Sequence, residues 1–197
     1  MQPYYQDEAV TIYHGDCRNI LPSLPKVDLV LTDPPYGVGY RESGWDAEIP
    51  DWLPTARAMA DTVIFTTAPL TLWDYPKPDW VLSWHRPASS SRRPDGKFNH
   101  WSPVLVYGKW GCSIDIISLH AIANAMPHGY KHPCPKPLRL FTWLVTGTEA
   151  QSILDPFMGS GTTIEAAKAL GRRAIGIEIE ERYCEIAANR CRQMVLL

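Results

Sequence analysis

Long apolar runs are missing from this sequence, and so is any cysteine or histidine pattern of a structural metal site. No stretch approaches the roughly 18 to 20 apolar residues that cross a bilayer, and the N-terminal MQPYYQDEAV contains no apolar signal region. We therefore expect a cytoplasmic protein with no membrane partner. The five cysteines form no C-x-x-C pair and the six histidines have no ligand spacing with carboxylates, so neither a disulfide framework nor a metal site is expected.

A strong excess of charge of either sign is also missing. The chain has 19 lysines and arginines against 21 aspartates and glutamates, which excludes neither a nucleic-acid partner nor a small molecule. A site for a polyanion must then be a local patch. With 197 residues and no internal repeat, the chain is expected to form one domain over residues 1–197.

Short β-rich runs alternate with helical patterns along the chain. This alternation predicts an α/β fold, with seven strands in a mostly parallel sheet and helices on both faces. The expected strands are 9–14, 28–33, 62–67, 79–84, 103–108, 151–155 and 173–178. The expected helices are 51–60, 136–146, 161–170 and 180–193.

The stretch SILDPFMGSGTTIEAAKALGRRAIGIE reads as a strand, a glycine-rich turn, a helix and a second strand. It lacks the G-K-[ST] of a phosphate-binding loop. An acidic residue, Glu178, follows the glycines by about twenty positions, the arrangement in which a carboxylate binds ribose hydroxyls. Gly159 and Gly161 let a ligand approach the backbone, and the helix start at Thr162 suits a carboxylate. An adenosine carrying an amino acid fits this turn better than a dinucleotide; a turn required only for packing is the alternative.

A second stretch, DLVLTDPPYG, ends a buried strand on a carboxylate, two prolines and an aromatic ring. Pro34 and Pro35 offer no N–H groups and stiffen the turn, so the Pro34 carbonyl and the Asp33 carboxylate can face one amino group together. Tyr36 supplies a face on which a base could stack. Two rigid acceptors would stabilise the positive charge that develops on an exocyclic amine during attack. The alternative is a simple turn with a surface tyrosine.

Three motifs in order, DPPYG, HPCPKP and DPFMGSGTT, resemble those of the S-adenosyl-L-methionine-dependent amino-methyltransferases that modify DNA. The position of DPPY before the glycine-rich turn is similar to the beta class. The resemblance implies a Rossmann-like, circularly permuted methyltransferase fold, with S-adenosyl-L-methionine as cofactor and DNA as partner. It also implies that Asp33, Pro34, Pro35 and Tyr36 form the catalytic element and act on a flipped-out base.

The same resemblance implies the residues that hold the methyl donor. Glu178 would contact its ribose, Asp16 its adenine and Lys136 its methionine carboxylate, while the FMGSG turn lies beside it. The full expected set is Asp16, Asp33, Lys136, Asp155, Phe157, Gly159, Ser160, Gly161, Thr162 and Glu178.

Contacts with nucleic acid are expected from a serine-rich basic loop near residues 86–100, for which a solvated surface loop is the alternative. Its candidates are His85, Arg86, Arg92, Arg93 and Lys97. The chain leaves little room for a separate target-recognition domain, so a minimal recognition segment is expected near residues 110–128. A homodimer is plausible from the resemblance alone.

The DPPY form favours the N6 amine of adenine as the methyl acceptor. Transfer to the N4 amine of cytosine is the nearest alternative, because both targets are exocyclic amines that need two acceptors. An RNA or free-nucleotide substrate is a further alternative, as is a non-catalytic nucleic-acid-binding module of the same fold. A dinucleotide-dependent oxidoreductase would leave DPPY unexplained.

Overall fold

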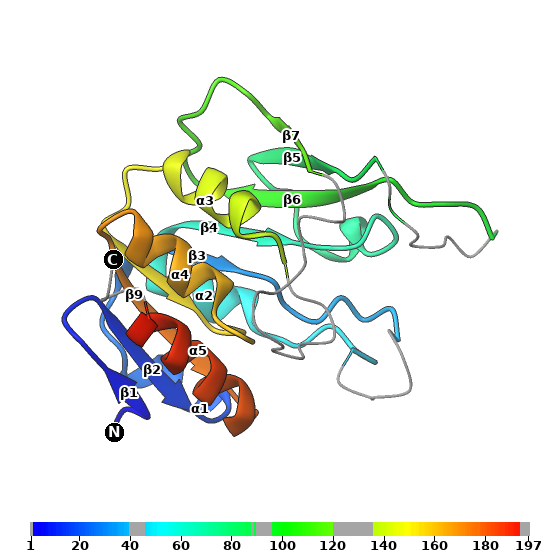
Figure 1. Cartoon of the computed structure of the whole chain (residues 1–197). Helices are drawn as coiled ribbons and strands as arrows, with labels where there is room; N and C mark the ends of the chain where they lie inside the picture. Colours follow the sequence, from blue (N-terminus) through cyan, green and yellow to red (C-terminus); the bar gives the residue numbers. More distant parts are fainter. Residues whose placement is uncertain (1, 40–45, 88, 90–95, 120–135, 194–197) are drawn as a thin grey trace.

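The computed structural model describes residues 2–39, 46–87, 89, 96–119 and 136–193. One mixed sheet runs through these residues (Figure 1), with the strand order β1-β2-β9-β8-β3-β4-β6-β5-β7. Neighbouring strands are parallel except where β1 or β6 is one of the pair. The prediction of a mostly parallel sheet is confirmed.

The seven expected strands are all present, within a few residues of their expected bounds. They are β2 (Val10–His14), β3 (Val27–Thr32), β4 (Ala60–Thr66), β5 (Trp80–His85), β6 (Trp101–Tyr107), β8 (Ser152–Asp155) and β9 (Arg173–Glu178). The count of seven was wrong, because the described part of the sheet has nine strands. The two additional strands, β1 (Tyr5–Gln6) and β7 (Ile116–Ser118), lie at the two edges and are too short to show an alternating or apolar pattern.

The four expected helices are also present. They are α2 (Leu53–Met59), α3 (Leu138–Thr146), α4 (Thr162–Ala169) and α5 (Glu181–Gln193). Three short elements add to them: α1 (Cys17–Ile20) and the 3-10 turns η1 (Leu21–Ser23) and η2 (Leu72–Asp74). No helix within the described ranges is long and apolar enough to cross a membrane.

Alternate residues of the central strands pack on opposite faces of the sheet. In β3, Leu29 and Leu31 join the core cluster that includes the buried side chains of α3, α4 and α5, whereas Val30 joins the cluster of α1 and α2. Figure 1 shows α3, α4 and α5 in front of the sheet and α2 behind it. A strand segment buried on both faces needs apolar residues at successive positions, which explains the run Leu29-Val30-Leu31 in β3. The predicted Rossmann-like arrangement, with helices on both faces, is confirmed.

The strand order reverses at the centre of the sheet. From β3 the chain passes through α2 to β4 on one side, and from β8 it passes through α4 to β9 on the other. Ligands of open α/β sheets bind beyond the carboxyl ends of the strands at such a reversal. DPPY follows β3 and the glycine-rich turn follows β8, so both predicted motifs leave the sheet at this point.

Truncation of Leu31 tests the central position of β3. Its side chain is fully buried, at 0% exposure, so Leu31→Ala is expected to lower the free energy of unfolding by about 2–5 kcal/mol. The matched control is Leu70→Ala, whose side chain is 63% exposed, with an expected change within about 0.5 kcal/mol. Urea denaturation measures both, and equal effects of the two changes would contradict this packing.

Candidate active site

Four parallel strands at the middle of the sheet each end at or just before a carboxylate. Asp155 and Glu178 are the last residues of β8 and β9, Asp33 directly follows β3, and Asp16 lies two residues beyond β2. These strands are consecutive neighbours in the order β2-β9-β8-β3. Since they are parallel, their carboxyl ends share one edge of the sheet, which we call the site edge.

Three donors surround the Asp33 carboxylate. The Tyr36 hydroxyl donates to Oδ1 over 2.6 Å, and the Thr66 hydroxyl donates to the same oxygen. The Lys136 ammonium donates to Oδ2 and forms an ion pair with it. The side chains of Asp33 and Lys136 are 23% and 13% exposed, so this pair is only partly reached by water. The acceptor expected at the end of β3 is thus a fixed, charged group.

Tyr36 lies against the same pair. Its ring centroid is 5.2 Å from the Lys136 nitrogen, within the range of a cation–π contact. Burial, followed by the negative charge of Asp33, raises the pKa of the Tyr36 hydroxyl well above its ordinary value. The hydroxyl therefore stays protonated and acts as a hydrogen-bond donor to the carboxylate.

Thr66 was not among the residues identified from the sequence. It is the last residue of β4, fully buried, and β4 pairs with β3 in the register Thr32 to Phe65. A polar residue ending the next parallel strand was the only available signal, in TVIFTT. Its contact with Asp33 depends on the strand pairing and not on nearness in the sequence.

The glycine-rich turn has the backbone shape that only glycine adopts readily. Gly159 and Gly161 have φ of +54° and +87°, and a Cβ on Gly161 would lie 2.7 Å from the Cβ of Ala187. The Gly159 N–H donates 2.8 Å to Oε2 of Glu178, and the Glu180 N–H donates 2.8 Å to Oε1. The carboxylate thus lies directly against the turn, and burial raises its pKa.

Asp155 lies behind the same turn. It is 2% exposed and accepts hydrogen bonds from the Thr32 hydroxyl at 2.5 Å and the Phe157 N–H at 3.0 Å. Burial raises the pKa of this carboxyl to about 7. Phe157 packs edge-on against Trp52, with ring centroids 5.5 Å apart. Asp155 therefore ties β3 to the start of the turn, and its expected contact with a cofactor stays a prediction.

The remaining expected donor-binding residues surround this turn. Ser160 and Thr162 are buried, at 3% and 7% exposure, and Arg190 donates to the Ser160 carbonyl at 2.6 Å. Asp16 caps α1 and pairs with Arg18 at 2.5 Å. A strand-end carboxylate against a left-handed glycine turn, followed by the amides at the start of α4, fits an adenosine that carries an amino acid.

A family model described as DNA methylase, for N6 and N4 methyltransferases, matches residues 73–189. The chain belongs to this family. It is thus a DNA methyltransferase, and S-adenosyl-L-methionine is its methyl donor. The permuted order of the motifs and the beta-class assignment remain predictions.

Three relatives illustrate the range of this methylase family. The DNA adenine methyltransferase YhdJ of Escherichia coli (strain K12) is 26% identical over 94% of this chain and 84% of its own length. The M1.HpyAVI complex with S-adenosylmethionine has a TM-score of 0.69 and 25% identity over 92% of this chain and 99% of that one. The cytosine-N4-specific PvuII DNA methyltransferase has a TM-score of 0.74, but its 18% identity, over 96% of this chain and 88% of that one, shows the fold alone.

The loop expected to bind DNA also begins and ends at the site edge. It joins the end of β5 to the start of β6, where His85 pairs with Trp101. Arg86 is held by this hairpin: its guanidinium lies 5.2 Å from the Trp84 ring centroid and donates to the Trp101 carbonyl at 3.4 Å. Lys97 is exposed. Arg92 and Arg93 lie outside the described residues. The DNA contacts of this loop stay predictions.

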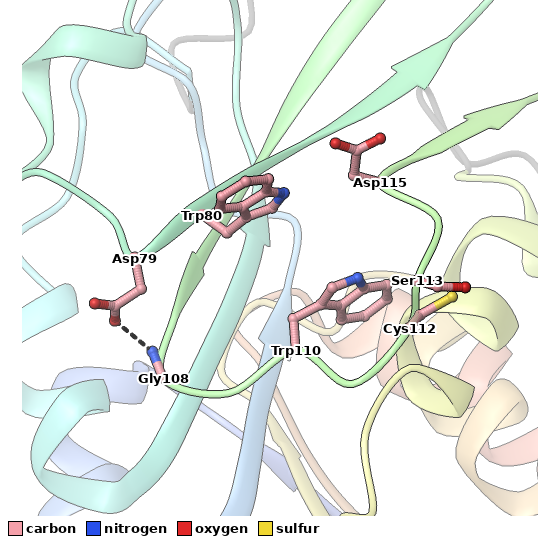
Figure 2. Close-up of a pocket in the computed structure, with 7 residues that line it drawn as sticks. All are labelled: Asp79, Trp80, Gly108, Trp110, Cys112, Ser113 and Asp115. Carbon is pink, nitrogen blue, oxygen red and sulfur yellow. Dashed lines mark hydrogen bonds between the residues drawn. The ribbon is translucent and has the colours of Figure 1, made fainter.

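The expected recognition segment near 110–128 begins at the opposite edge of the sheet. A cavity of about 390 Å³ lies there, between the ends of β5 and β6 (Figure 2), lined by Asp79, Trp80, Gly108, Trp110, Cys112, Ser113 and Asp115. The Asp79 carboxylate accepts from the Gly108 N–H at 2.7 Å. β7 then returns the chain to the site edge at Ser118, and residues 120–128 lie outside the described part. Recognition by residues 110–115 would therefore require DNA to reach the far edge.

The raised pKa of Asp155 predicts how stability depends on pH. The pKa of this carboxyl is 3.8 in the unfolded chain and about 7 in the folded one. Between these values the folded protein holds a proton that the unfolded chain has released, so the free energy of unfolding falls as pH rises through this window. Asp155→Asn keeps the acceptor oxygen and removes the titration. We expect its melting temperature, relative to the wild type, to rise from about pH 4 to about pH 7, measured by thermal melts; a pH-independent difference would contradict the assignment.

Proposed function

We propose that this DNA methyltransferase acts on the N6 amine of adenine in a base flipped out of the duplex. The observation that carries the proposal is the Asp33 carboxylate, fixed at the end of β3 beside the rigid Pro34-Pro35 turn. It lies at the site edge, where the glycine-rich turn also begins after β8. An acceptor for the amine and a cradle for the donor are thus adjacent.

The exocyclic amine is a weak nucleophile because its lone pair is delocalised into the ring. Asp33 and the Pro34 carbonyl supply two acceptors for its two N–H groups, which favours a tetrahedral nitrogen and stabilises the positive charge that builds up during attack. The Tyr36 ring supplies a stacking face, worth about 1–3 kcal/mol per base. The donor supplies an electrophilic methyl group, and these residues hold the acceptor against it.

The hydrogen-bond donors around Asp33 limit how the amine can bind. Oδ1 already accepts from Tyr36 and Thr66, whereas Oδ2 accepts from Lys136. Since a carboxylate oxygen can accept about two hydrogen bonds, Oδ2 is the oxygen with an acceptor site left for the amine. We propose that the amine displaces Lys136 from it, because the motif resemblance implies that this lysine contacts the methyl donor. The Lys136 ammonium then needs another anion, and the methionine carboxylate of the donor is the one that the motif resemblance implies. With this exchange, binding of the methyl donor increases the affinity for the base.

Two considerations favour adenine over cytosine. The motif is DPPY. In addition, YhdJ, which aligns with 94% of this chain, is described as a DNA adenine methyltransferase. Cytosine N4 is the second candidate, because the same two acceptors serve either amine. Membership of the methylase family leaves the oxidoreductase alternative without support, and the ordered donors around Asp33 argue for turnover over a silent binding module.

Recognition of the DNA sequence is proposed to be minimal. The alignment with YhdJ extends over 249 positions although it uses only 94% of this chain's 197 residues, so the relative contains inserted segments that this chain lacks. The loop near 86–100 and the segment beyond Ser118 leave the site edge and are the candidates for base contacts. A second subunit would supply the rest in a homodimer, the assembly that the resemblance suggests.

Replacement of Asp33 tests the proposed chemistry. Asp33→Ala removes the acceptor for the amine and is expected to lower the rate of methyl transfer at least about 100-fold. It also releases Lys136 from its ion pair, so affinity for S-adenosylmethionine should be unchanged or higher. Labelled transfer to unmethylated DNA of mixed sequence, digestion and mass spectrometry measure the product, and calorimetry measures donor binding.

The product of the wild-type reaction decides between the candidates. N6-methyladenine is the expected nucleoside, and N4-methylcytosine would keep the mechanism but replace the substrate. Donor binding without any methylated nucleoside would favour RNA or the non-catalytic module. Full activity of Asp33→Ala would remove Asp33 from the mechanism.

A further inference from the structure

We propose that Asp46 is the positioning residue that holds the DPPYG turn in its working shape, an inference that rests on the proposed methyl transfer. The carboxyl group of Asp46 belongs to a residue that is only 3% exposed. Its side chain contacts the backbone of the turn. It therefore acts through Asp33 and Tyr36, the groups proposed to meet the base.

The backbone N–H groups of the DPPYG turn donate hydrogen bonds to Asp46. Pro34 and Pro35 have no N–H, so the first amides after Asp33 belong to Tyr36 and Gly37. Both donate to the same oxygen, Oδ1 of Asp46, over 2.5 Å and 3.1 Å. The one carboxylate thus satisfies both amides of the Pro-Pro-Tyr-Gly segment.

The backbone of Asp46 adds a third link. Its carbonyl accepts from the Gly39 N–H at 2.8 Å. Gly37 has φ of +69°, and a Cβ there would lie 2.8 Å from Cγ1 of Ile49. The segment 46–49 therefore lies closely against the turn. Side chain, carbonyl and close packing hold the same few residues from one side.

The consequence for chemistry follows from where Tyr36 is held. Its N–H is fixed by Asp46, while its hydroxyl reaches back to Oδ1 of Asp33 at 2.6 Å. A shift of the Tyr36 backbone would move the stacking face and the carboxylate together. Misplacement of reacting groups by about 1 Å can cost on the order of 100-fold in rate. Asp46 is thus expected to govern turnover while leaving the donor cradle, built from other strands, intact.

Three substitutions separate hydrogen bonding from charge. Asp46→Asn keeps an acceptor oxygen at the same place, Asp46→Glu keeps the charge but moves the oxygens outward, and Asp46→Ala removes both. The matched control is Asp51→Ala, an exposed carboxylate five residues along. We expect single-turnover methyl transfer to fall about 10- to 100-fold for Ala and Glu, with Asn within about threefold of the wild type and Asp51→Ala unchanged. Donor affinity, measured by calorimetry, should stay within about twofold throughout.

A second readout does not depend on the reaction. Amide exchange of Tyr36 and Gly37, followed by NMR, should accelerate in the Ala and Glu variants and stay slow in Asn. Unchanged exchange in Asp46→Ala, or wild-type transfer by that variant, would overturn the proposal. So would equal activity of the Asn and Glu variants, a comparison that carries the test if Asp46→Ala does not fold. If the wild type methylates no DNA but the Tyr36 and Gly37 amides exchange as expected, the proposed function is wrong and the role of Asp46 in holding the turn stands.

Discussion

The parallel pairing of β3 with β8 is the constraint on which the site depends. Leu29 lies opposite Ile153 and Val30 opposite Leu154, although about 120 residues separate them in the chain. β3 leads into the DPPYG turn, which we call the acceptor turn, and β8 leads into the glycine-rich turn. The bond from the Thr32 hydroxyl to Asp155 fixes the two ends against each other. The strand order reverses here, and ligands of open α/β sheets bind beyond the carboxyl ends of the strands at such a reversal.

Two neighbouring strands that both end on a carboxylate must limit the repulsion between them. Asp33 and Asp155 solve this in different ways. Asp33 forms an ion pair with Lys136. Burial raises the pKa of the Asp155 carboxyl to about 7, and the negative charge of Asp33 adds to this shift. Asp33, which is partly exposed, is the member that is proposed to exchange its partner for a ligand. The buried member serves as a hydrogen-bonded link, and its two acceptor contacts give it a structural task.

The sequence allowed the central elements and the two turns to be predicted, because each depends on local properties. Unbroken apolar runs mark strands buried on both faces, and glycines with positive φ mark the donor turn. β1 and β7 were missed because two or three residues carry no period. Thr66 and Asp46 were missed for another reason: each contacts the acceptor turn through the tertiary fold, and neither belongs to a motif. Lys136 was expected beside the donor, and its ion pair with Asp33 could not be read from spacing.

Under the proposed exchange of partners, that ion pair couples the binding of the base to the binding of the methyl donor. If the amine replaces Lys136 on Asp33 while no donor is bound, a partly buried ammonium, 13% exposed, loses its counter-ion at a cost in free energy. A donor carboxylate within its reach removes this cost. By linkage, whatever the donor adds to the affinity for the base, the base adds equally to the affinity for the donor. Under the proposed exchange, Lys136 thus favours the complex that contains both reactants over either complex alone.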